Sequence, residues 1–143
     1  MKIRKQSGCV VFRKNKEISA IEILLVQKVE GEGWGFPKGG VQKDMTESES
    51  AVKETFEEAG VKGKLGKRLG EYIYRKDGKD QIVYLYPMRV NKEFEEWPEM
   101  KIRQRKWVSV DEAKILTNKK LHRFYENLEP KGFIQRFIEK VFK

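Results

Sequence analysis

The chain has 143 residues, of which 38% are hydrophobic and 37% charged, and its formal net charge is +9. This length predicts one α+β domain over residues 1–143, and the single cysteine excludes an intramolecular disulfide or a cysteine metal knuckle. No apolar run approaches the roughly 20 residues that a membrane span needs. We therefore expect a cytoplasmic protein with no membrane partner, whose positive charge favours an anionic ligand.

The first forty residues predict two strands followed by a loop. Apolar residues at positions 7–12 and 21–28 are typical of strands, and the polar segment between them is typical of a turn. The sequence "GEGWGFPKGG", residues 31–40, contains five glycines and a proline, so it predicts a loop with at most a short strand.

The clearest predicted element is a helix that begins after Thr46. Thr46 and Glu49 form a capping-box pattern, which satisfies free amides at a helix start. Gly60 is placed to end the helix in the left-handed conformation. Since Val52, Phe56 and Ala59 lie at helical spacing, we expect them to form the buried face.

The rest of the chain predicts further strands, an acidic loop and helices. The segment "EFEEWPEM", residues 93–100, is predicted to be a loop, and a short helix is expected over residues 110–116 with Asp111 as its N-cap. Apolar residues at helical spacing predict helix over residues 119–143, with a second segment starting at Pro130. Strands are predicted over residues 65–75, 81–90 and 103–110.

Three glutamates of the first helix, Glu54, Glu57 and Glu58, lie three and four residues apart and therefore share one face. Lys53 lies at the edge of this face, within reach of Glu57. A cluster of like charges is unfavourable in isolation, but it lies next to a glycine loop that permits close approach of a ligand. Because magnesium prefers carboxylate oxygens together with substrate phosphates, the pattern favours a metal site.

These residues resemble the sequence box of the Nudix hydrolases. Gly39 fills the first position, and "KETFEEAGV", residues 53–61, fills the last block with the spacing kept. Three positions depart from the pattern. Met45 replaces a glutamate, Lys53 replaces an arginine and Thr55 replaces an aliphatic residue.

The resemblance implies an α/β/α sandwich with a mixed β-sheet, and the cleavage of a phosphoanhydride by water. It implies that Glu54, Glu57, Glu58 and the Gly39 carbonyl hold Mg²⁺, with Mn²⁺ as an alternative. It also implies that Lys53, in the place of the arginine, orients the box glutamates. Lysine keeps the charge of that arginine but loses its planar fork, and we expect an active enzyme.

Residues 8–128 are most similar to the branch of the family that acts on diphosphoinositol polyphosphates and dinucleoside polyphosphates. For phosphate binding, the candidates are basic residues, some of which match basic positions in that branch. The resemblance implies that the proton of the attacking water passes either to a glutamate of the box or to a carboxylate of a distant loop, for which Glu95, Glu96 and Glu99 are the candidates here. Four aromatic residues could stack on a nucleobase, although core packing is preferred for most of them: Trp34, Tyr72, Tyr74 and Tyr86. The phosphate-binding candidates are Arg4, Lys5, Lys38, Arg103 and Arg105.

Dinucleoside polyphosphates are our first choice of substrate. The alternatives are a diphosphoinositol polyphosphate, the 5′ end of RNA, and a catalytically weak Nudix module that binds a nucleotide or RNA. Met45 and Lys53 favour the binding module, whereas the intact Glu54, Glu57 and Glu58 favour the enzyme. No DNA partner is expected, because the basic residues form no separate arm.

Overall fold

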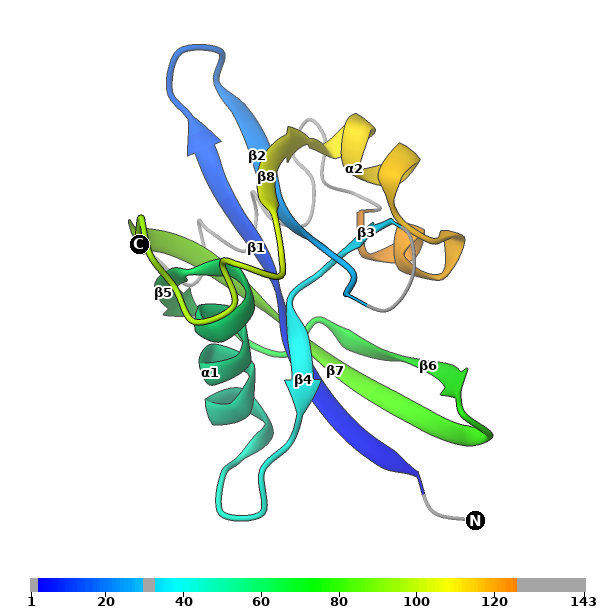
Figure 1. Cartoon of the computed structure of the whole chain (residues 1–143). Coiled ribbons are helices and arrows are strands. Elements are labelled where there is room, and N and C mark those ends of the chain that lie inside the picture. Colours follow the sequence, from blue (N-terminus) through cyan, green and yellow to red (C-terminus); the bar gives the residue numbers. More distant parts are fainter. Residues whose placement is uncertain (1–2, 30–32, 126–143) are drawn as a thin grey trace.

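The computed structural model describes residues 3–29 and 33–125, which form an eight-stranded mixed sheet with helices on both faces (Figure 1). The sheet confirms the predicted α/β/α sandwich. The strands are β1 (Arg4–Asn15), β2 (Ala20–Gln27), β3 (Trp34–Gly35), β4 (Lys38–Gly40), β5 (Val61–Leu65), β6 (Gly70–Lys76), β7 (Lys79–Glu93) and β8 (Arg105–Ser109). The helices are α1 (Glu47–Ala59), α2 (Val110–Leu116) and the 3₁₀ helix η1 (Lys119–Tyr125).

The central strand β1 changes partner along one of its edges. Its first half pairs with β4 through residues 6–8, and its second half pairs with β2 through residues 11–15. Its other edge pairs in parallel with β7, while the remaining pairs are antiparallel. Gly8 permits the change, because a Cβ atom there would overlap the backbone of Pro37. The strands β2 and β4 consequently diverge and leave an opening in the sheet (Figure 1).

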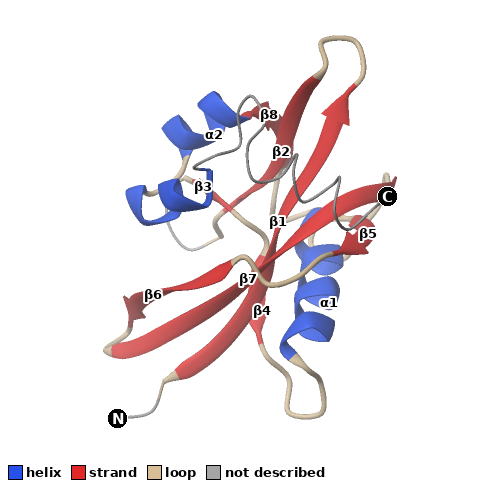
Figure 2. Cartoon of the chain, turned by 180° about the vertical axis from the view of Figure 1, so that it is seen from behind, coloured by secondary structure: helices blue, strands red, loops and turns tan. Residues whose placement is uncertain are grey.

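Alternating residues of β1 belong to two separate cores. Val10 and Phe12 pack on the side of α2 and η1, whereas Cys9 and Val11 pack on the side of α1. This period of two is what a strand buried on both faces requires. Seen from behind, the strands separate α1 from α2 (Figure 2). None of the helices in the described ranges is long and apolar enough to cross a membrane.

The capping of α1 is as predicted. The Thr46 side chain accepts a hydrogen bond from the Glu49 amide, the Glu49 carboxylate accepts one from the Thr46 amide, and Gly60 adopts φ 66°. These bonds fix where the helix starts and where it ends. They therefore set which turn carries each glutamate.

The predicted buried face of α1 is wrong in part. Ala59 is buried, but Val52 and Phe56 are only partly buried, and Phe56 packs edge-on against Phe94 with ring centroids 5.3 Å apart. Small side chains face the sheet instead, and the Cys9 thiol lies 3.7 Å from the Ala51 carbonyl oxygen. The close approach of helix and strand excludes larger residues. The buried residues of α1 are Ser50, Ala51, Thr55, Glu58 and Ala59.

Other boundaries also differ from the prediction. The predicted strand 65–75 is two strands, because β5 and β6 pair with different parts of β7. The N-cap of α2 is Ser109 and not Asp111, since the Ser109 hydroxyl accepts a hydrogen bond from the Glu112 amide. The segment after Asn118 begins as a 3₁₀ helix, and the helix predicted from Pro130 lies outside the described residues.

Replacing either of two threonines by valine should change the free energy of unfolding, but in opposite directions. Among the described residues, the buried Thr55 hydroxyl makes no hydrogen bond beyond a weak one with the Cys9 thiol, so Thr55→Val should raise the free energy of unfolding by about 1 kcal/mol. Thr46→Val removes the N-cap acceptor and should lower the free energy of unfolding by about 1 kcal/mol. Urea denaturation of both variants measures the two effects. A clear loss of stability in Thr55→Val would contradict the assignment of a weakly bonded hydroxyl.

Candidate active site

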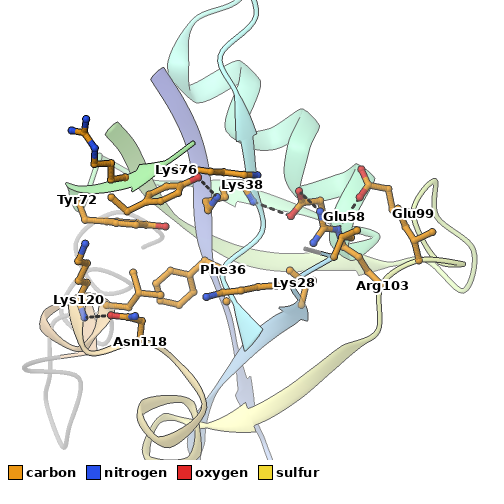
Figure 3. A pocket seen from close by; sticks show the side chains of 17 residues that line it. Lys28, Phe36, Lys38, Glu58, Tyr72, Lys76, Glu99, Arg103, Asn118 and Lys120 are labelled. Carbon is orange, nitrogen blue, oxygen red and sulfur yellow. Dashed lines mark hydrogen bonds and ion pairs between the residues drawn. The ribbon is translucent and has the colours of Figure 1, made fainter. Parts of the chain in front are cut away.

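A pocket of about 730 Å³ lies where the sheet opens (Figure 3). Two carboxylates, Glu58 and Glu99, lie at one end of it. Three aromatic residues, Phe36, Tyr72 and Tyr74, also line it. Most of the remaining polar lining is basic, so the pocket is suited to an anion with several charges. The basic residues are Lys28, Lys38, Arg75, Lys76, Arg103 and Lys120.

Glu58 is the most buried of the three glutamates on the predicted carboxylate face. Its carboxylate accepts hydrogen bonds from the Lys38 backbone amide at 3.1 Å and from the Arg103 guanidinium at 3.1 Å. Burial raises the pKa of Glu58 to about 7, although the positive charge of Arg103 opposes this rise. Glu58 is therefore a carboxyl group that gains or loses its proton near neutral pH.

Glu54 and Glu57 complete the predicted carboxylate face. Glu54 lies directly against Gly39, where a Cβ atom would overlap its carboxylate. Burial and the negative charge of Glu57 raise the pKa of Glu54. Lys53 lies between the two, with its ammonium nitrogen 2.6 Å from Glu57 Oε1 and 3.7 Å from Glu54 Oε2. The structure thus brings Gly39, Lys53, Glu54 and Glu57 together.

A fourth carboxylate, Glu99, reaches this face from the loop between β7 and β8. Arg103 holds it, with Nε donating to Glu99 Oε1 at 2.8 Å, while Nη1 of Arg103 donates to the Gln27 carbonyl at 2.8 Å. The Glu99 charge contributes to the raised pKa of both Glu54 and Glu58. Of the acidic loop residues considered from the sequence, Glu99 lines the pocket, whereas Glu95 and Glu96 are exposed.

The donor atoms of this face fit a hard divalent cation. Carboxylate oxygens are its preferred ligands, and a cation would relieve the repulsion that raises the pKa of Glu54. In the part of the chain that the structure describes, however, no three acidic, histidine or cysteine side chains are arranged to hold a metal. Lys53 pairs with Glu57, and Arg103 pairs with Glu58. Metal binding would therefore require these carboxylates to exchange partners.

Two of the predicted phosphate-binding residues, Lys38 and Arg103, line the pocket. The Lys38 ammonium group lies 3.0 Å from both Gln6 Oε1 and the Tyr74 hydroxyl, and Tyr74 lines the pocket. Its charge is therefore directed into the pocket (Figure 3). Arg103 also faces the pocket, beside Glu58 and Glu99.

The other three candidates lie elsewhere. Arg4 and Lys5 are exposed on β1 and do not line the pocket, and the alternation along this strand places Lys5 on its α1 side. Arg105 donates to the carbonyls of Ala59 and Phe94, at 2.8 and 2.6 Å. These contacts hold the loop after β7, and Arg105 is not among the residues that line the pocket.

Several pocket residues were missed from the sequence. Tyr72 and Tyr74, for which core packing was preferred over stacking on a nucleobase, do both: they pack against the core and line the pocket, with their ring centroids 6.2 Å apart. The lysines were not identified from the sequence. Lys28, Lys76 and Lys120 come from three distant segments. Their side chains meet only through tertiary structure, so no local pattern could have identified them.

The family model for the NUDIX domain matches residues 2–128. The chain belongs to the Nudix family. It is 43% identical to Nudix hydrolase 4 of Arabidopsis thaliana over 120 residues, which cover 78% of this chain and 58% of that protein. It is 35% identical over 127 residues to human diphosphoinositol polyphosphate phosphohydrolase 3-alpha, covering 85% of this chain and 75% of that protein.

The architecture is also that of solved Nudix structures. A binary complex of the Ap4A hydrolase of C. elegans superimposes with a TM-score of 0.71 at 24% identity, covering 85% of this chain and 92% of that one. At this identity the likeness shows the shared fold. The matched region spans less than two thirds of the length of the Arabidopsis relative.

The raised pKa of Glu58 should make metal-free stability depend on pH. The folded chain keeps the Glu58 proton up to a pH of about 7, whereas the unfolded chain releases it near 4.5. Between pH 4.5 and 7 the folded state thus binds more protons than the unfolded state. The contribution of Glu58 to the free energy of unfolding should therefore fall as the pH rises from 4.5 to 7. Urea denaturation across this range measures the effect. Glu58→Gln should flatten the dependence, and an unchanged slope would contradict the assignment.

Proposed function

We propose that this protein is a metal-dependent Nudix hydrolase that cleaves a phosphoanhydride bond with water. The observation that supports this most is a pocket lined by two carboxylates, Glu58 and Glu99, and six basic residues, with Glu54 and Glu57 on the same helix as Glu58. Acidic side chains suit a divalent cation, and basic side chains suit the phosphates of a substrate. Membership of the Nudix family supports the same conclusion.

Glu54, Glu57, Glu58 and the Gly39 carbonyl would hold Mg²⁺, or Mn²⁺ in its place. Bound there, the ion would supply charge neutralisation to the phosphates and acidify water. The glycine at position 39 lets the Glu54 carboxylate approach the backbone. Lys53 would orient Glu57 through their ion pair.

The basic residues and Glu99 would act on the substrate itself. Lys38 and Arg103 would bind phosphate oxygens, because their cationic groups line the pocket beside the carboxylates. We assign to Glu99 the role of accepting a proton from the attacking water. It is the carboxylate of the 93–100 loop that lines the pocket, and a base must lie within hydrogen-bond reach of its proton.

Dinucleoside polyphosphates remain our first choice of substrate. The pocket combines a row of cations with the aromatic faces of Phe36, Tyr72 and Tyr74. A nucleobase can stack on such a face, whereas an inositol pyrophosphate would use only the cations. The named relatives include both types, an Ap4A hydrolase and a diphosphoinositol polyphosphate phosphohydrolase.

A second candidate function is a binding module with little turnover, for a nucleotide or the 5′ end of RNA. The Lys53–Glu57 ion pair favours it, since a lysine bound to a metal ligand competes with the metal. Such a module would bind without a divalent ion and weaken steeply with salt.

A substrate panel separates these functions. Product release would be measured from diadenosine tetraphosphate, an inositol pyrophosphate and triphosphorylated RNA, each with Mg²⁺ and with EDTA. We expect Mg²⁺-dependent release that is fastest for the dinucleotide. Binding to any member without release would favour the module and overturn the enzyme.

Glu57→Gln should reduce turnover by about 100-fold or more, because it removes a proposed metal ligand and its charge. The melting temperature should change little, since Glu57 is only partly buried. Glu95→Gln, in an exposed position of the acidic loop, is the matched control and should leave turnover unchanged. Equal turnover in both variants would show that Glu57 holds no metal.

A further inference from the structure

We propose that Trp97 and Arg105 are positioning residues, which hold the last turn of α1 so that Glu57 and Glu58 can bind a metal. The inference rests on the proposed function. Both residues belong to the segment from Phe94 to Arg105, which follows β7 and crosses the C-terminal end of α1 (Figure 1). We call this segment the clamp.

The last turn of α1 is an unfavourable place for carboxylates. The final carbonyl groups of a helix have no partner within it and carry the negative end of the helix dipole. Cationic side chains normally stabilise this end, but α1 has no basic residue in its last turn. Glu57 and Glu58 add two further negative charges there. Without outside donors, this turn would fray.

The clamp supplies a donor to each of these carbonyls. The Glu57 carbonyl accepts the Glu99 amide at 3.0 Å, and the Glu58 carbonyl accepts the Trp97 indole N–H at 3.0 Å. The Ala59 carbonyl accepts Arg105 Nη1 at 2.8 Å. The Gly60 carbonyl accepts the Phe94 amide at 2.8 Å. Two of the four donors are side chains, so they can be removed without breaking the backbone.

Trp97 and Arg105 act as one unit. The Arg105 guanidinium lies 3.9 Å from the centre of the Trp97 ring, and its Nη2 donates to the Phe94 carbonyl at 2.6 Å. A Cβ atom on Gly60 would lie 2.5 Å from Arg105 Nη1 and 2.8 Å from Trp97 Cβ. Gly60 therefore allows the clamp to approach the helix, besides adopting φ 66°. The guanidinium also brings a positive charge to the negative end of α1.

This contact has a direct consequence for metal binding. Groups behind metal ligands hold those ligands in place, and their removal typically costs about 10–100-fold in metal affinity or activity. Glu58 supplies both a proposed metal ligand and the carbonyl that Trp97 binds. Loosening this turn would move the two carboxylates together and leave Glu54, one turn earlier, in place.

The test replaces Trp97 by phenylalanine, which keeps an aromatic ring beside Arg105 but removes the indole N–H. Trp107→Phe is the matched control. Its indole also donates to a glutamate oxygen, Glu93 Oε1 at 3.2 Å, and an arginine, Arg13, lies 4.0 Å from its ring centre. Within the described residues the Trp107 indole makes no hydrogen bond to α1, and Glu93 pairs with Arg105 through its other oxygen, Oε2, at 3.4 Å. Mn²⁺ binding would be measured by electron paramagnetic resonance on the full chain. Amide exchange of Gly60, whose N–H donates to Phe56, would be followed without metal.

Trp97→Phe should raise the Mn²⁺ dissociation constant by about tenfold and speed exchange of the Gly60 amide, while Trp107→Phe changes neither by more than about twofold. Equal effects of the two variants would overturn the clamp. If Trp97→Phe does not fold, Arg105→Lys is used instead, because lysine keeps the positive charge but lacks the planar guanidinium group with its several donors. No Mn²⁺ binding by the wild-type chain would instead overturn the proposed function and the inference with it.

Discussion

The constraint on which the site depends is the placing of two carboxylates at the negative end of a helix. Glu57 and Glu58 occupy the last turn of α1, where the helix dipole disfavours them. Burial then raises the pKa of Glu58 further. The fold offsets this cost with donors to the helix carbonyls and with two cations, Lys53 and Arg103, on the carboxylates. The carboxylates of the proposed metal site are thus paired with the chain's own positive groups in this structure.

The second requirement is space, and glycine supplies it at three positions. Gly8 lets the chain at Pro37 cross β1, Gly39 lets the Glu54 carboxylate approach β4, and Gly60 lets the clamp approach α1. The first of these contacts helps to part β4 from β2, which opens the pocket. Basic side chains from separate segments line this pocket and make its surface positively charged.

Local features could be predicted from the sequence, and tertiary features could not. Thr46, Glu49 and Gly60 marked both ends of α1, because caps are contacts between near neighbours. The buried face of α1 was misjudged, since its closeness to β1 selects Thr55 over the larger Phe56. Arg105 was predicted to bind phosphate, and the structure places it outside the pocket, where it donates to the backbone carbonyls of Ala59 and Phe94. Charge alone does not distinguish a ligand-binding arginine from a structural one.

The most direct test of the account is to locate a bound divalent ion on the folded chain. Substoichiometric Mn²⁺ broadens the amide NMR signals of nearby residues, and the metal site proposed here joins β4 to the last two turns of α1. The signals of Gly39, Glu54, Glu57 and Glu58 should broaden first, while that of Gly78, in the turn between β6 and β7, stays sharp. Broadening centred on Glu95 and Glu96, or spread evenly over the acidic surface, would contradict the proposed site.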